Sequence, residues 1–201
     1  MAKQDKRQAI MEAAEKLFKD RRFHEITLDE LARVARVCKG TSYLHFKDKD
    51  DLFFQTATSG FEGLCELLHR KVPEKAPFSK QILSACAEIS EFFKGRRQLI
   101  RMMQTEEGRM LFCHGRLREL WQEKRKKLAA ALAAIIRKGV EAGEIRADIP
   151  PEILASFLLG MLRTRGHDLA DAPEQSRRYE LVTDLFRNGA GRQADKRPAK
   201  D

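Results

Sequence analysis

The sequence lacks any apolar run of the about 18–20 residues that a membrane-spanning helix requires. Valine occurs only five times in 201 residues, against 23 alanines and 22 leucines, and no Asn-Gly or Asp-Gly hairpin signal is present. Alanine and leucine favour helices, whereas valine favours strands. These shortages exclude a membrane-spanning protein and predict an all-α fold.

The chain also begins without the apolar core of a secretory signal, because Met1–Lys6 leads directly into a charged amphipathic segment. We therefore expect a cytoplasmic protein with no membrane partner. A composition of 42% hydrophobic and 34% charged residues is globular and excludes a mostly disordered chain. The net charge of +9 is compatible with a nucleic-acid partner but does not by itself establish one.

Signatures of catalysis are missing as well. No Ser-His-Asp order, H-E-x-x-H motif, phosphate-binding glycine-rich loop or paired-carboxylate pattern can be assembled from this sequence. We therefore expect a protein that is not an enzyme and that needs no cofactor.

The four cysteines, at positions 38, 65, 86 and 113, form no C-x-x-C pair and are expected to be reduced thiols. One alternative stays open, a thiol-based redox or metal sensor that uses Cys65 with His69 or Cys113 with His114. Two ligands on a helix do not complete a tetrahedral site, so no metal site is predicted.

Hydrophobic periodicity, punctuated by proline and glycine, predicts about nine helices. The expected helices cover residues 6–19, 28–35, 38–46, 49–71, 78–94, 96–105, 109–142, 151–166 and 174–188. Thr27 and Glu30 have the spacing of a capping box before the second helix, and Asp48 is the expected N-cap of the fourth. The polar, Gly- and Pro-containing residues 190–201 are expected to form a disordered tail.

Two short helices, separated by three residues and followed by a longer one, have the layout of a helix-turn-helix. The second of them carries the donors and the aromatic ring that a helix in the DNA major groove needs, and its glycine permits close approach to phosphate. A lysine in the first turn of the following helix lies where unpaired amides already favour phosphate. These residues are Lys39, Gly40, Thr41, Tyr43, His45 and Lys49.

The stretch from Phe23 to Leu52 reads FHEITLDELARVARVCKGTSYLHFKDKDDL, and it closely resembles the N-terminal domain of the tetracycline-repressor (TetR) family. The positions at the family's spacing are Thr27, Ala32, Val37, Lys39, Gly40, Thr41, Tyr43, Phe46, Lys49 and Leu52. Residues 139–146 and 148–155 resemble the loop before helix 8 of that family.

Three positions depart from the family pattern. Arg36 replaces the usual glycine of the turn, so we expect a non-glycine residue in the left-handed conformation, at a cost of about 1 kcal/mol. Cys38 replaces the usual serine cap and is a weaker acceptor. Ser42 stands where a larger apolar residue is common, which leaves a smaller core contact beneath the helix.

The resemblance implies a transcriptional regulator, usually a repressor, that binds double-stranded operator DNA as a homodimer and leaves it when a small effector binds. It further implies a helix-turn-helix DNA-binding domain over residues 1–50 and a helical effector-binding and dimerisation domain over residues 51–189. The expected DNA contacts are Thr27, Arg36, Lys39, Gly40, Thr41, Tyr43, His45 and Lys49.

Two further sets of residues follow for the second domain. By resemblance, the last two helices pair with their symmetry mates, and their candidate positions are Leu158, Leu159, Met161, Leu162, Leu181, Val182, Leu185 and Phe186. The concentration of Phe and Met in this domain suits an adaptable apolar cavity and an apolar or aromatic effector. Its candidate lining is Phe61, Cys65, Phe92, Phe93, Met102, Met103, Phe112, Trp121 and Phe157.

Overall fold

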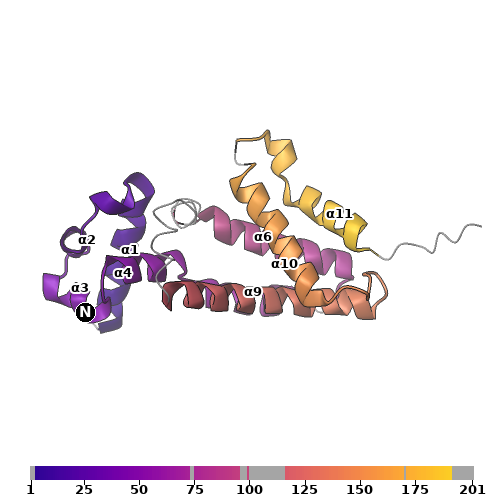
Figure 1. Cartoon of the computed structure of the whole chain (residues 1–201), viewed down its shortest axis with the longest axis horizontal. Helices are drawn as coiled ribbons and strands as arrows, with labels where there is room; N and C mark the ends of the chain where they lie inside the picture. Colours follow the sequence, from indigo (N-terminus) through magenta and orange to yellow (C-terminus); the bar gives the residue numbers. More distant parts are fainter. Residues whose placement is uncertain (1–2, 73–74, 96–98, 100–115, 170, 192–201) are drawn as a thin grey trace, which may run out of the picture. The chain divides into compact units, whose positions relative to one another are not determined.

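The computed structural model describes residues 3–72, 75–95, 99, 116–169 and 171–191 (Figure 1). Its α-helices are α1 (Lys3–Asp20), α2 (Leu28–Val34), α3 (Lys39–His45), α4 (Lys49–Ala57), α5 (Phe61–Lys71), α6 (Phe78–Gly95), α9 (Arg116–Glu141), α10 (Pro151–His167) and α11 (Tyr179–Ala190). Two 3-10 turns, η1 (Phe23–Glu25) and η2 (Glu174–Arg177), complete the helical elements. The described ranges contain no strand, only an isolated bridge between Ile145 and Gly191, so the all-α expectation is confirmed. None of the described helices combines the length and apolarity that crossing a membrane requires.

The chain divides into two compact units. Unit 1 comprises the chain up to Phe61 together with Leu99 and residues 116–124, and unit 2 comprises the described residues of 62–95 and 125–191. Each unit is described on its own below.

Unit 1 is built around an apolar cluster to which α1, α2 and α4 all contribute. Its buried members are Ile10, Met11, Ala14, Phe18, Ile26, Leu28, Leu31, Phe46, Leu52, Phe53, Ala57 and Leu99. Phe18, Phe23 and Phe53 form an aromatic trio within it, with ring centroids 5.0 to 5.9 Å apart. Aromatic pairs at this separation add to the free energy gained by burial alone, so the trio fixes α4 against α1 and η1.

In unit 2, α6, α10 and α11 pack against one another, as Figure 1 shows. Gly139 of α9 lies directly against the ring of Phe78 at the start of α6, and a Cβ added there would lie 2.7 Å from that ring. Glycine at this position therefore allows the close approach of the two helices. The loop after α9 is tied to the end of α11, because the amide of Arg146 donates to the carbonyl of Ala190 over 3.0 Å.

The prediction of one helix over residues 49–71 is wrong. α4 ends at Ala57, a turn follows at residues 58–60, and α5 begins at Phe61. The hydroxyls of Thr56, Thr58 and Ser59 donate to the carbonyls of Leu52, Phe54 and Thr56, each over 2.8 Å. Hydroxyls that bond to helix carbonyls weaken the helix. Gly60, with φ of 79°, then takes the left-handed conformation that ends it.

Other expected boundaries need smaller corrections. The segment expected as a helix over 174–188 begins as the η2 turn, and α11 starts at Tyr179 and extends to Ala190. The helix expected at 96–105, except for Leu99, and the first part of that expected at 109–142 lie outside the described residues. The same holds for residues 192–201 of the expected tail.

Candidate nucleic-acid interface

The turn between α2 and α3 is set by the backbone of Arg36. This residue adopts φ of 56°, in the left-handed region that favours glycine, as its position in the sequence predicted. The amides of Arg36 and Val37 donate to the carbonyls of Arg33 and Ala32 over 3.1 and 3.0 Å, which closes the turn. The guanidinium-bearing side chain is exposed, so the turn presents a cation to solvent.

α3 turns one face outward and the other into the core. Tyr43 is 53% exposed, and Lys39 and Gly40 are also exposed, whereas Thr41 and His45 are half-buried. A Cβ added at Gly40 would meet nothing within 4 Å, so the helix backbone is bare at that point. The outward face therefore carries three of the five DNA contacts expected on α3.

Within the described part of the chain, α3 lacks two hydrogen bonds that would stabilise it, one on its buried face and one at its N-cap. Ser42 is fully buried, and its hydroxyl has no hydrogen-bond partner within the described residues. Cys38 occupies the N-cap but its side chain makes no capping hydrogen bond. An unpaired buried hydroxyl costs about 1–3 kcal/mol. The two departures noted in the sequence therefore both reduce the stability of this helix.

The helices on either side of α3 have better caps. The hydroxyl of Thr27 accepts from the amide of Glu30 over 3.2 Å, which confirms one half of the expected capping box. The carboxylate of Glu30 does not close the box, because it accepts from Arg21 over 2.6 Å instead. Asp48 caps α4 as expected, accepting from the amide of Asp51 over 2.7 Å.

Lys39, the first residue of α3, is paired in the isolated chain. Its ammonium Nζ lies 2.5 Å from Oδ2 of Asp29 on α2, and both side chains are exposed. This hydrogen bond and the charge of Asp29 raise the pKa of Lys39 above its ordinary value. The lysine therefore stays charged at neutral pH, but a phosphate must compete with Asp29 for it.

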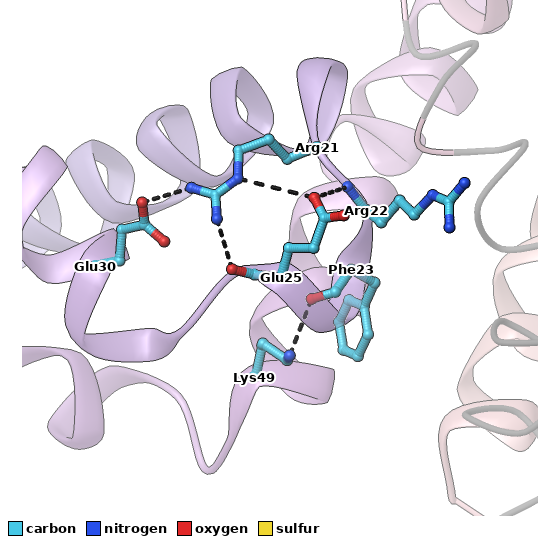
Figure 2. A network of polar contacts seen from close by, with 6 residues as sticks. All are labelled: Arg21, Arg22, Phe23, Glu25, Glu30 and Lys49. Carbon is cyan, nitrogen blue, oxygen red and sulfur yellow. Dashed lines mark hydrogen bonds and ion pairs between the residues drawn. The ribbon is translucent and has the colours of Figure 1, made fainter.

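Lys49, the first residue of α4, is half-buried against η1. Its Nζ donates to the carbonyl of Phe23 over 2.9 Å and lies 4.2 Å from the centroid of the Phe23 ring (Figure 2). Burial lowers the pKa of Lys49 relative to an exposed lysine. One of the three ammonium donors is thus used within the protein, and no hydrogen bond among the described residues uses the other two.

Arg21 holds the same turn from the opposite side, as Figure 2 shows. Its guanidinium donates to the carbonyl of Glu25 and to the carboxylate of Glu30, each over 2.6 Å. The carboxylate of Glu25 accepts from the amide of Arg22 over 3.2 Å. The turn after α1 is therefore tied to α2 through Arg21 and to α4 through Lys49.

Leu44 is a residue that the sequence analysis missed. It is 80% exposed, the largest exposed fraction among the large apolar side chains that the structure describes. The sequence of α3 gives no signal for its orientation, because a helix of seven residues is too short for its apolar periodicity to define a face.

The residues proposed for an effector pocket do not all face inward. Phe157 is 65% exposed on α10, which does not favour its assignment to a pocket lining. Phe61 is buried in unit 1, where its ring lies 5.6 Å from that of Trp121, while Phe92 and Phe93 belong to unit 2. Half-buried Cys65 also lies in unit 2, whereas Met102, Met103 and Phe112 lie outside the described residues.

The candidate dimer positions divide into two groups. Leu181 and Leu185 are exposed on α11, and Leu159 and Met161 are half-buried on α10. The remaining four are buried inside unit 2 and belong to its core: Leu158, Leu162, Val182 and Phe186. Ile153 and Phe157 of α10 are exposed apolar residues that the sequence analysis did not assign to this face.

The cysteines give no support to a thiol or metal sensor. Within the described residues, no three His, Cys, Asp or Glu side chains gather in a way that could hold a metal ion. Cys86 is buried, and burial raises the pKa of its thiol to about 11, so this sulfur is unreactive at neutral pH. Cys113 and His114 lie outside the described residues.

Comparison with known families supports the helix-turn-helix interpretation. Residues 10–56 match the model for bacterial regulatory proteins of the tetR family, and residues 113–183 match that for the tetracyclin repressor-like C-terminal domain. The chain belongs to the TetR family. It is therefore a DNA-binding transcriptional regulator, a member of a family of regulators rather than enzymes.

Several relatives of this TetR-family chain match over nearly its whole length. The transcriptional repressor Rv1474c of Mycobacterium tuberculosis is 25% identical over 187 residues, which cover 93% of this chain and 94% of that protein. The structure of FadR from Bacillus subtilis in complex with stearoyl-CoA aligns with a TM-score of 0.75 at 20% identity, covering 90% of this chain and 98% of that one. That of SmeT of Stenotrophomonas maltophilia in complex with triclosan gives 0.69 at 19% identity, covering 97% and 96%. The two structural matches establish a shared fold.

Proposed function

We propose that this TetR-family regulator represses transcription as a homodimer on a palindromic operator and is released by a small apolar or aromatic effector. The observation that carries the proposal is the outward face of α3, where Lys39, Gly40 and Tyr43 are exposed directly after the left-handed turn at Arg36. A helix-turn-helix presents its second helix to the major groove in this way. In a dimer, two such helices enter successive grooves about 34–36 Å apart.

The proposed DNA contacts fall into two classes. Side chains on or next to the outward face of α3 read base edges or the sugar-phosphate backbone, and those at helix starts and in the turn bind phosphate. The complete set is Thr27, Arg36, Lys39, Gly40, Thr41, Tyr43, His45 and Lys49. Residues 1–50 form the DNA-binding domain in this proposal, residues 51–189 the effector-binding and dimerisation domain, and residues 190–201 a tail.

The proposed dimer face lies on α10 and α11. Ile153 and Phe157 on α10, and Leu181 and Leu185 on α11, are exposed apolar residues that lie four positions apart on their helices. Residues at this spacing share one helix face. An exposed apolar patch of this kind marks an interaction surface, and a second copy of the chain supplies a matching one.

The proposed effector has a substantial apolar part. FadR was solved with stearoyl-CoA and SmeT with triclosan, and each of these molecules carries a large apolar group. In this chain, the effector is proposed to bind within residues 51–189. The candidate lining residues that lie in unit 2 are Cys65, Phe92 and Phe93, and the exposed Phe157 is assigned to the dimer face instead.

The DNA-binding part is tested with the full-length protein and a duplex that it enriches from a random library. Tyr43→Ala is expected to reduce the free energy of binding by about 1–3 kcal/mol and to change the preferred sequence, because an exposed ring at the groove contacts bases or sugars. Leu169→Ala, which alters an exposed apolar residue of unit 2, is the matched control and should bind like wild type. Equal affinity of wild type and Tyr43→Ala at every salt concentration would contradict the assignment of α3.

A further inference from the structure

Among the described residues, no packing contact explains the position of Leu44. Leu44 is 80% exposed on α3. The residues two positions before and after it, Ser42 and Phe46, are both buried. A leucine that leaves most of its side chain in water gains little from folding, because little of its apolar surface is buried. An apolar side chain held outward in this way fits a partner that offers apolar surface.

The surroundings of Leu44 allow a partner to come close. Gly40 lies four residues earlier on the same helix face, and the space around its Cα is empty. Tyr43, 53% exposed, flanks Leu44 on the same outward surface. The side chain of Leu44 therefore projects beside a bare stretch of helix backbone, where a flat surface can reach both the leucine and the ring.

The chemistry of the major groove narrows what such a side chain can contact. Base edges in this groove present hydrogen-bond donors and acceptors, and the C5 methyl group of thymine is the apolar group among them. Leucine has no donor or acceptor and can discriminate bases only through that methyl group. The charged and hydroxyl-bearing neighbours on α3 cover the polar part of the recognition.

We propose that Leu44 is a specificity-determining residue that packs against a thymine methyl group in each half of the operator. The proposal rests on the proposed function, since it requires α3 to lie in the major groove. It assigns to the operator a thymine whose methyl group, and not its hydrogen-bonding edge, is recognised by Leu44.

The experiment removes the methyl groups one at a time. The duplex enriched from a random library by the full-length wild-type protein is resynthesised with deoxyuridine in place of each symmetry-related pair of thymines. Uracil keeps every hydrogen-bonding group of thymine and lacks only the methyl group. Affinities of wild type, Leu44→Ala and the control Leu169→Ala are measured for each duplex by fluorescence anisotropy.

At one thymine pair, wild type and Leu169→Ala are expected to lose about fourfold in affinity per half-site, the factor expected for one buried methyl group. The loss for the symmetric pair is then about 15-fold. Leu44→Ala is expected to bind the thymine and uracil duplexes with affinities within about 1.5-fold of each other. The shorter alanine side chain does not reach the thymine methyl group, so removal of that methyl group costs this variant little. Because Leu44 is exposed, the substitution should leave the melting temperature unchanged.

Three results would overturn the proposal. Leu44→Ala could lose affinity equally for all duplexes, which would indicate contact with the sugar-phosphate backbone. It could respond to uracil as wild type does, which would assign the methyl contact to another residue. It could change the oligomeric state in gel filtration, which would make Leu44 a contact between protein chains. Failure of wild type to enrich any duplex would instead contradict the proposed function itself.

Discussion

Lys49 is expected to serve both the stability of unit 1 and its affinity for DNA, and Lys49→Met tests both contributions in two separate measurements. Methionine keeps most of the aliphatic stem but removes the charge. The substitution removes the 2.9 Å hydrogen bond to the carbonyl of Phe23 and the ammonium that lies 4.2 Å from the Phe23 ring. A charged hydrogen bond contributes about 1.5–3 kcal/mol, and a cation over an aromatic ring about 0.5–1 kcal/mol. Burial of the charge, which lowers the pKa of Lys49, offsets part of this. We therefore expect the free energy of unfolding to fall by about 1–2 kcal/mol.

Trp121 makes the measurement specific to unit 1. It is the single tryptophan of the chain and lies in unit 1, with its ring 5.6 Å from that of Phe61. Urea unfolding followed by tryptophan fluorescence thus reports the stability of the unit that contains Lys49. Lys19→Met is the control, because Lys19 is exposed and its pairing with Glu15, at 3.8 Å, is weak.

The DNA contribution of Lys49 is read from the salt dependence of binding. If the two remaining ammonium donors bind phosphate, Lys49→Met should reduce the slope of log K against log salt by about one per subunit. Lys49→Arg keeps the charge and should keep the slope. An unchanged unfolding free energy would refute the argument for the Phe23 contact, and an unchanged slope would refute the phosphate contact.

Three further outcomes follow from individual contacts. Ser42→Ala should raise the unfolding free energy of unit 1 by about 1 kcal/mol, measured by tryptophan fluorescence in urea, because it removes a buried hydroxyl without a partner. In a gel-shift assay, Asp29→Asn should increase affinity for operator and non-operator duplexes alike by about 2- to 5-fold, because Lys39 no longer has to leave a carboxylate at 2.5 Å. The control Asp20→Asn changes the net charge by the same amount and should change affinity less. The thiol of Cys86, whose pKa burial raises to about 11, stays protonated in the folded state where the unfolded thiol ionises. The stability that it contributes is therefore fully present below pH 9 and is lost between pH 9 and 11. In urea titrations followed by circular dichroism, Cys86→Ala should reduce this alkaline loss by about 2–3 kcal/mol.

The sequence predicted the parts of unit 1 that depend on local chemistry. A hydroxyl or carboxylate before a helix has few alternatives to capping it, so Thr27 and Asp48 could be assigned as caps directly. The left-handed turn at Arg36 was predictable for a different reason, because the resembling family usually has glycine at this position of the turn.

The sequence did not predict two features, the break in the helix over 49–71 and the exposure of particular apolar side chains. Both depend on several residues acting together. The break in the helix over 49–71 arises from Thr56, Thr58, Ser59 and Gly60 acting together, while the apolar periodicity on both sides continues as if the helix were unbroken. The orientations of Leu44 and Phe157 could not be read from residue type, since each is apolar and exposed. Periodicity identifies a helix but does not tell which apolar residues its neighbours leave uncovered.

The turn at residues 58–60 changes how α4 can be moved. A continuous helix from Lys49 to Lys71 would be rigid, so a rotation of its C-terminal end would also rotate its N-terminal end. Instead, the turn at residues 58–60 interrupts the helix where the chain leaves unit 1. The hydroxyl bonds of Thr56, Thr58 and Ser59 weaken the end of α4 at this turn, and the two backbone dihedral angles of Gly60 can absorb a twist of α5. α4 is therefore a separate helix of unit 1 and not the first half of a longer rigid helix.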